Sequence, residues 1–110
     1  MMAGTFDQLD RLAKDIAAKA FSSPDSSYTA KLISKGVEKC AKKFGEEAVE
    51  LVIATVEKNK TETAKEAADV LYHLLVLLQS AGVSPSAVMA ELKRREGTSG
   101  LVEKASRTES

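Results

Sequence analysis

The sequence predicts an all-α fold, a helical bundle of about five helices, and two observations lead to this prediction. Ala, Leu, Lys and Glu, all good helix formers, are abundant among its 110 residues, whereas proline occurs only twice. Apolar residues recur at helical spacing, and no segment of useful length alternates with the period of a β-strand. The helical domain is predicted to cover residues 1–96, followed by a polar C-terminal tail at 97–110.

The first two predicted helices are separated by a serine-rich loop. The first covers Thr5–Phe21, with Thr5 as a possible cap. Its apolar residues lie at helical spacing: Phe6, Leu9, Leu12, Ile16 and Ala20. After the loop, a short helix is predicted to begin near Ser27 and to continue to about Ile33, before a break at Gly36.

Three longer segments complete the predicted bundle. Helices are expected at about Val37–Glu57, from Thr61 or Thr63 to about Ser80, and from Ser84 to about Glu96. Gly82 is expected to stop the second of these. Pro85 lies in the first turn of the last helix, where the missing N–H of proline has no cost. No role is assigned to the tail Gly97–Ser110.

Charge and apolar content exclude several classes of protein. Sixteen Lys and Arg balance sixteen Asp and Glu, which argues against a nucleic-acid partner. The longest apolar stretch, Val70–Leu78, is far too short to span a membrane. The single cysteine, Cys40, cannot form an internal disulfide, and no secretion signal is evident. We therefore expect a cytoplasmic protein without a membrane partner.

Two acidic pairs lie on helix faces where carboxylates are unexpected. Glu47 and Glu50 are three residues apart, hence on one side of a helix, and Glu47 lies along its apolar stripe. Asp69 lies in the next helix, which is apolar almost all round, and Glu66 lies one turn earlier. A carboxylate directed toward a core is costly unless it is paired or binds a metal.

The short connection between these helices predicts that they pack antiparallel. If the turn lies near residues 59–60, Glu50 faces Asp69. Glu47 and Glu66 then lie within about one helical turn of that level. Such a cluster of carboxylates would repel itself without a cation. Because oxygen-only ligands favour Mg²⁺ or Mn²⁺, and Mg²⁺ usually keeps open positions for phosphates, a phosphate-ester substrate is predicted.

Three segments together carry the pattern of a known family: Ser27–Leu32, Lys43–Glu50 and Glu66–Leu78. They resemble the phosphoribosyl-ATP pyrophosphatase family, which belongs with the MazG-type enzymes to the all-α nucleotide pyrophosphohydrolases. The acidic pairs match the pattern of the whole superfamily. The Ser-Tyr-Thr opening and the Tyr-His-Leu-Leu-Val-Leu-Leu run select the histidine-biosynthesis branch. The resemblance extends from roughly Phe6 to Glu96.

The resemblance implies a phosphoribosyl-ATP diphosphatase, which hydrolyses phosphoribosyl-ATP to phosphoribosyl-AMP and pyrophosphate in the second step of histidine biosynthesis. The chain is similar to the stand-alone form, without the cyclohydrolase domain of fused relatives. On this hypothesis Mg²⁺ binds the triphosphate and four carboxylates: Glu47, Glu50, Glu66 and Asp69. The proton of the attacking water passes to Glu46, or to a metal-side carboxylate such as Glu47 or Glu50.

Further residues are candidates for substrate binding or for support of the acids. Lys39 and Lys43 lie one turn apart, close to the first acidic pair, and are candidates for phosphate contacts; lysines on a solvated face are the alternative. Other candidates are Ser27, Thr29, Lys31 and Arg95. A plain helix cap would explain Ser27 as well. Tyr72 and His73 are candidate supports for the carboxylates, and ordinary packing would also account for them.

A homodimer, or a higher even oligomer, is predicted because the Val70–Leu78 surface exceeds what two neighbouring helices cover. The four-helix core would then be built from both chains. Two other functions compete with the main hypothesis. A housekeeping hydrolase of non-canonical nucleoside triphosphates would use the same acids. A helical dimerisation domain without catalysis predicts no stabilisation by Mg²⁺, and it leaves Asp69 without a partner.

Overall fold

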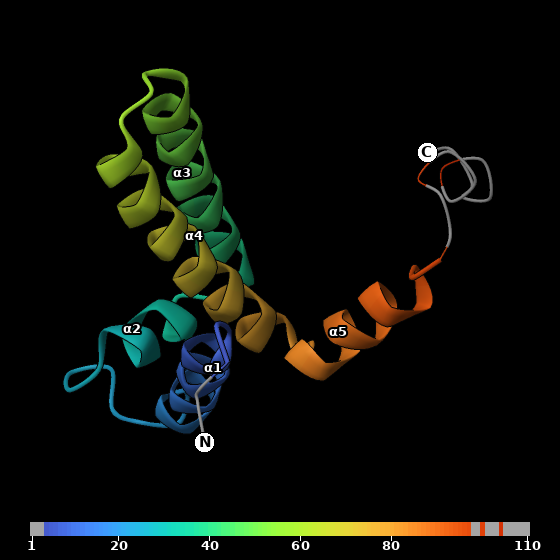
Figure 1. Ribbon diagram of the computed structural model, residues 1–110. Coiled ribbons are helices and arrows are strands. Elements are labelled where there is room, and N and C mark those ends of the chain that lie inside the picture. The colour runs from blue at the N-terminus through green and yellow to red at the C-terminus, as the bar shows by residue number, and fades with distance from the viewer. Residues whose placement is uncertain (1–3, 98–99, 101–103, 105–110) are drawn as a thin grey trace.

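The computed structural model describes residues 4–97, 100 and 104, and that part of the chain forms an all-α structure (Figure 1). Its helices are α1 (Asp7–Lys19), α2 (Tyr28–Ser34), α3 (Val37–Val56), α4 (Lys60–Ala81) and α5 (Pro85–Arg94). The predicted fold class is therefore confirmed. The predicted tail, apart from Gly97, Gly100 and Lys104, lies outside the described residues.

The antiparallel hairpin of α3 and α4 is the centre of the fold (Figure 1). Its turn places Lys58 in the left-handed region, with φ of 62°. The side chain of Asn59 then caps α4 by accepting the N–H of Glu62 at 3.0 Å. The prediction that Thr61 or Thr63 is the cap is wrong, since both lie within α4. The hairpin turn is consequently centred on Lys58.

The core lies where α1 and α2 pack against the end of the hairpin that is remote from this turn (Figure 1). Its buried members come from four helices: Ile16, Leu32, Cys40, Leu75 and Val76. Helix α1 begins after Phe6 and has no side-chain cap, so the predicted cap Thr5 is not used. Helix α1 is therefore stabilised by packing of its apolar face against α4 rather than by an N-terminal cap.

Helix α5 turns away from the other helices, bent by 106° from α4 (Figure 1). Gly82 ends α4 in the left-handed conformation, with φ of 73°. Ser84 caps α5 by accepting the N–H of Ala87 at 3.1 Å, and Pro85 is its first residue, as predicted. Among the described residues no single helix is long and apolar enough to cross a membrane, and only the bent α4–α5 pair meets these criteria jointly.

Candidate active site

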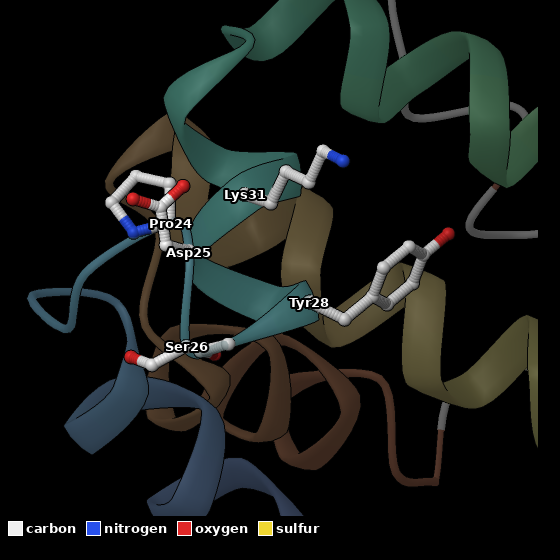
Figure 2. A pocket seen from close by; sticks show the side chains of 6 residues that line it. Pro24, Asp25, Ser26, Tyr28 and Lys31 are labelled. Carbon is white, nitrogen blue, oxygen red and sulfur yellow. The ribbon is translucent and has the colours of Figure 1, made fainter.

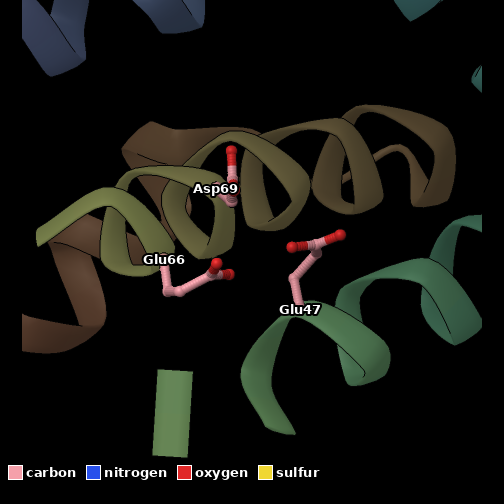
Figure 3. A group of neighbouring side chains, drawn as sticks. All are labelled: Glu47, Glu66 and Asp69. Atoms are coloured by element: carbon pink, nitrogen blue, oxygen red, sulfur yellow. The ribbon is translucent and has the colours of Figure 1, made fainter. Parts of the chain in front are cut away.

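Three carboxylates from both helices of the hairpin meet in one cluster (Figure 3). Glu47 of α3 and Glu66 and Asp69 of α4 each offer an oxygen atom within 4.8 Å of the others. Glu47 is only 8% exposed, as expected from its position along the apolar stripe, and Glu66 is partly buried. Asp69 is exposed, so the inference that it points into an apolar core is wrong. We call these three residues the acidic cluster.

The register of the hairpin differs from the prediction because its turn is centred on Lys58. Glu47 lies eleven residues before Lys58 and Asp69 eleven residues after it, so the two residues lie at the same height along the antiparallel helices. Glu50 and Glu66 lie eight residues on either side. The prediction that Glu50 faces Asp69 is therefore wrong. Glu50 instead interacts with Glu47 and Glu66, and these neighbouring carboxylates raise its pKa.

The donor atoms of the acidic cluster suit a hard divalent cation. All of them are carboxylate oxygens, which Mg²⁺ and Mn²⁺ prefer. Oε2 of Glu66 is buried without a hydrogen-bond partner in the described part of the chain. A buried, ionised oxygen in that position is costly unless a cation or a donor approaches it. The cluster therefore fits a metal ion, to which Glu47, Glu66 and Asp69 would be ligands, with Glu50 beside them.

A lysine-lined cleft adjoins the acidic cluster. Nζ of Lys43 lies 3.3 Å from Oε1 of Glu47, and this contact raises the pKa of Lys43. The cleft has a volume of about 260 Å³, and its cationic lining consists of Lys35, Lys39, Lys42 and Lys43. We call it the lysine cleft. Glu46 also lines it and does not belong to the acidic cluster, so it lies beside Lys43 rather than among the candidate metal ligands.

Two of these lysines, Lys35 and Lys42, were not among the residues singled out from the sequence. Lys42 lies three residues after Lys39 and could have been found by its helical spacing. Lys35 precedes Gly36, where the chain changes direction between α2 and α3. Its approach to α3 therefore depends on how α2 packs, which helical periodicity does not determine.

The candidates on α2 have different surroundings. Ser27 caps α2, accepting the N–H of Ala30 at 3.1 Å, as the plain-cap alternative expects. Thr29 is buried, and its hydroxyl group is hydrogen-bonded to that of Tyr72 at 2.5 Å, so a direct contact of Thr29 with substrate is not supported. Lys31 and Tyr28 line a second cleft, of about 390 Å³ (Figure 2). Tyr28 also lines the lysine cleft, so it stands between the two.

Tyr72 and His73 connect α2 to the neighbourhood of the acids. The ring of Tyr72 is stacked against Tyr28, with centroids 6.5 Å apart, and it also meets His73 edge-on, with centroids 5.0 Å apart. Burial lowers the pKa of His73, which favours the neutral imidazole. The charges of Glu47, Lys43 and Asp69 also act on the pKa of this ring, so it lies in the neighbourhood of the acidic cluster.

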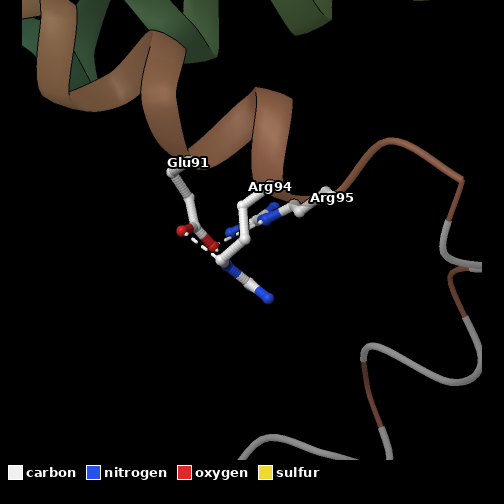
Figure 4. A network of polar contacts seen from close by, with 3 residues as sticks. All are labelled: Glu91, Arg94 and Arg95. Carbon is white, nitrogen blue, oxygen red and sulfur yellow. Dashed lines mark hydrogen bonds and ion pairs between the residues drawn. The ribbon is translucent and has the colours of Figure 1, made fainter.

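Arg95 is not brought to the acidic cluster within this chain, because it follows α5, which turns away (Figure 1). It binds Glu91 instead, with Nε of Arg95 3.1 Å from the carboxylate (Figure 4). Arg94 approaches the same carboxylate at 2.7 Å. Hydrogen bonds from Arg94 and then Arg95 lower the pKa of Glu91 to about 2. The predicted contact of Arg95 with substrate phosphates therefore has no support within one chain.

Comparison with known proteins identifies a family that covers most of the chain. Residues 9–96 match the family described as phosphoribosyl-ATP pyrophosphohydrolase. A phosphoribosyl-ATP pyrophosphatase of Cereibacter sphaeroides is 59% identical over 99 residues, which are 90% of this chain and 96% of the relative. One of Parvibaculum lavamentivorans is 55% identical over 108 residues, 98% of this chain and 99% of the relative. The resemblance recognised in the three sequence segments is confirmed.

Proposed function

We propose that this chain, which belongs to the phosphoribosyl-ATP pyrophosphohydrolase family, hydrolyses phosphoribosyl-ATP to phosphoribosyl-AMP and pyrophosphate, the second step of histidine biosynthesis. The observation that carries this proposal is the acidic cluster of Glu47, Glu66 and Asp69. Its oxygens come from two helices, and one of them is buried without a partner. The cytoplasmic setting and the absence of a nucleic-acid partner, both predicted from the sequence, belong to the same proposal.

Mg²⁺ is the proposed cofactor, with Mn²⁺ as a substitute, and Glu47, Glu50, Glu66 and Asp69 are its proposed protein ligands. When bound, the ion supplies charge neutralisation of the phosphates and lowers the pKa of a coordinated water. The buried position of Glu47 keeps its carboxylate directed at the site rather than at bulk solvent. His73, whose pKa is lowered by burial, is proposed to support the acidic cluster from nearby.

The proposed reaction adds one water across the α–β phosphoanhydride. A bridging P–O bond breaks, the water oxygen becomes bonded to one of the two phosphorus atoms, and its proton passes to a carboxylate. Glu50 is one candidate to accept this proton, because it is exposed and lies beside the acidic cluster. Glu46 is the other candidate from the sequence, and it lies on the side of the lysine cleft. Lys39 and Lys43 are proposed to contact phosphate oxygens.

Turnover of phosphoribosyl-ATP is the direct test. We expect release of pyrophosphate in the presence of Mg²⁺ and none after treatment with EDTA, with activity restored when Mg²⁺ is returned in excess. A panel of deoxynucleoside triphosphates and non-canonical nucleotides should be turned over much more slowly. Faster hydrolysis of that panel than of phosphoribosyl-ATP would contradict the proposed substrate. An absence of Mg²⁺-dependent hydrolysis of every nucleotide would contradict the proposed enzyme.

A homodimer, or a higher even oligomer, is proposed as the active assembly. The apolar surface that supports it differs from the one predicted, because much of the Val70–Leu78 segment is already covered within one chain. Exposed valines instead gather on α3, including Val49, Val52 and Val56, with exposed fractions of 58%, 61% and 72%. Their spacing puts them on one side of the helix, and burying them would supply the driving force for association.

Introducing a charge on this face should separate the chains. Val52→Glu would place an unpaired carboxylate in the proposed interface, so we expect the dimer dissociation constant to rise at least about 100-fold. Light scattering across a concentration series measures this constant. Ala17→Glu, at an exposed position of α1, is the matched control and should leave it unchanged. A wild-type chain that is fully active as a monomer at every concentration would rule out the proposed assembly.

A further inference from the structure

The lysine cleft has a local excess of positive charge in a chain whose net charge is zero. Lys35 comes from the end of α2, and Lys39, Lys42 and Lys43 come from the first half of α3. A single carboxylate, that of Glu46, lines the same cleft. The cations are therefore concentrated here rather than distributed evenly over the surface.

Several positive charges come close together in this cleft when no anion is present. Lys39 lies three residues before Lys42 and four before Lys43, and like charges at these helical spacings repel each other. All three lie in the first half of α3, and Lys39 is in its first turn, where the helix dipole favours negative groups. A bound anion would remove both penalties.

Several lysines outside the cleft are paired with a carboxylate of their own helix. Three of them have a carboxylate one turn away on their own helix, in ion pairs of 2.9 to 3.7 Å: Lys14, Lys19 and Lys65. Within the described part of the chain, no carboxylate lies within ion-pair distance of Lys35, Lys39 or Lys42. The ammonium groups of Lys35, Lys39 and Lys42 are thus available to an external anion, whereas that of Lys43 also contacts Glu47.

The position and size of the cleft narrow the choice of anion. Lys43 lines the cleft and also contacts Glu47 of the acidic cluster at 3.3 Å, so an anion held there would lie next to the reacting phosphates. The cleft volume of about 260 Å³ is below the roughly 300–1,000 Å³ of pockets that enclose drug-sized ligands. A small anion with several charges suits this space better than a whole nucleotide.

We propose that the lysine cleft binds the diphosphate part of the substrate, the part released as pyrophosphate, and that Lys35 and Lys42 contribute to its binding. This inference rests on the proposed function. It fixes the direction of the substrate, with the β and γ phosphates over the start of α3 and the nucleoside beyond the acidic cluster. Four ammonium groups attract phosphate oxygens as point charges and stabilise the negative charge of the departing group once the bridging P–O bond has broken.

Direct binding of inorganic pyrophosphate tests the cleft separately from catalysis. Isothermal titration calorimetry in EDTA and low salt should give a measurable affinity that weakens as salt is raised. We expect the double variant Lys35→Gln/Lys42→Gln to lose at least about tenfold in this affinity. Lys35→Arg/Lys42→Arg should retain it. Lys14→Gln/Lys65→Gln removes the same number of charges elsewhere and should leave it unchanged.

Steady-state kinetics provide the second measurement. With phosphoribosyl-ATP and Mg²⁺, the Lys35→Gln/Lys42→Gln enzyme should show weaker product inhibition by pyrophosphate, at least about tenfold, and a lower kcat/KM. Its melting temperature should stay close to that of the wild type, because Lys35 and Lys42 are exposed and exposed substitutions change stability little. A lower melting temperature would show that these lysines support the fold, and would overturn the proposal.

The proposal fails if pyrophosphate binds the glutamine double variant and the wild type equally well. It also fails if ribose 5-phosphate, a probe for the phosphoribosyl end of the substrate, loses affinity in that variant while pyrophosphate does not. Failure of the proposed function has a different signature. In that case the wild type would not hydrolyse phosphoribosyl-ATP, although pyrophosphate would still bind the cleft in a lysine-dependent way.

Discussion

Replacing Glu66 with Gln, or Asp69 with Asn, is expected to reduce turnover of phosphoribosyl-ATP at least about 100-fold. Each change keeps the size of the side chain and removes the negative charge that a cation requires. Loss of a group that merely supports a metal ligand already costs about 10- to 100-fold in affinity or activity, so loss of a proposed ligand should cost more. Initial rates at saturating Mg²⁺ measure the effect. Glu57→Gln, at an exposed position at the end of α3, is the matched control and should remain active.

Thermal melting separates loss of the metal from loss of the fold. A ligand present at 100 times its Kd stabilises the folded state by about 2.7 kcal/mol, so wild-type protein should melt higher with Mg²⁺ than with EDTA. Glu66→Gln should lose most of this Mg²⁺-dependent rise. In EDTA it should melt no lower than the wild type, because a buried carboxylate oxygen without a partner has been neutralised. An active Glu66→Gln enzyme with an unchanged response to Mg²⁺ would remove the acidic cluster from the mechanism.

Repulsion between the carboxylates of Glu47, Glu50 and Glu66 should make the stability of the metal-free protein depend on pH. Glu47 and Glu66 raise the pKa of Glu50 above its ordinary value in the folded state. In the interval between the ordinary and the raised pKa the folded state binds more protons than the unfolded state, so this group makes the metal-free fold less stable as pH rises. Bound Mg²⁺ should reverse that trend, because it favours the ionised carboxylates. The close carboxylates therefore destabilise the metal-free protein and at the same time favour binding of a cation.

Ile16→Ala is expected to destabilise the fold by about 2–5 kcal/mol, the usual cost of truncating a buried isoleucine. Ile16 is 1% exposed and is the buried residue that fixes α1 to the core formed with α2, α3 and α4. For a domain near 100 residues, each kcal/mol lowers the melting temperature by about 4–8 °C, so a fall of roughly 10 °C or more is expected. Thermal and urea denaturation, monitored by circular dichroism, measure this change.

Phe21→Ala is the control for the core prediction, since it removes a larger apolar side chain that is 91% exposed. Its cost should stay within about 0.5 kcal/mol. At temperatures where Ile16→Ala remains folded, its turnover should be close to normal, because the acidic cluster belongs to the α3–α4 hairpin rather than to α1. Equal destabilisation by the two variants would mean that Phe21 is covered in solution, and that α1 has a second contact.

The helices themselves could be predicted from the sequence because their signals are local. Apolar spacing depends only on the helical period, and caps such as Ser27 and Ser84 act within three residues. The fold class, the approximate extent of each helix and the family could therefore be obtained without coordinates. Two predictions at helix starts were wrong: α1 has no side-chain cap, so Thr5 is not used, and Asn59 caps α4 in place of Thr61 or Thr63.

The acidic residues could also be singled out from the sequence, but their partners could not. Periodicity fixes the direction of each side chain around its own helix, whereas the pairing between helices depends on where the turn is centred. A shift of one residue moves a side chain by about 1.5 Å along the axis and about 100° around it. With Asn59 as the cap, Glu47 rather than Glu50 comes level with Asp69, and Asp69 remains exposed.

The sequence by itself therefore determined which residues form helices, which acids are unusual for their positions, and which family the chain resembles. Only the tertiary structure decided which groups share a space. The turn at Lys58 joined Glu47, Glu66 and Asp69, and the packing of α2 brought Lys35 to the lysines of α3. The physical reason is range: helical periods and caps act over a few neighbouring residues, while the acidic cluster and the lysine cleft depend on packing between segments distant along the chain.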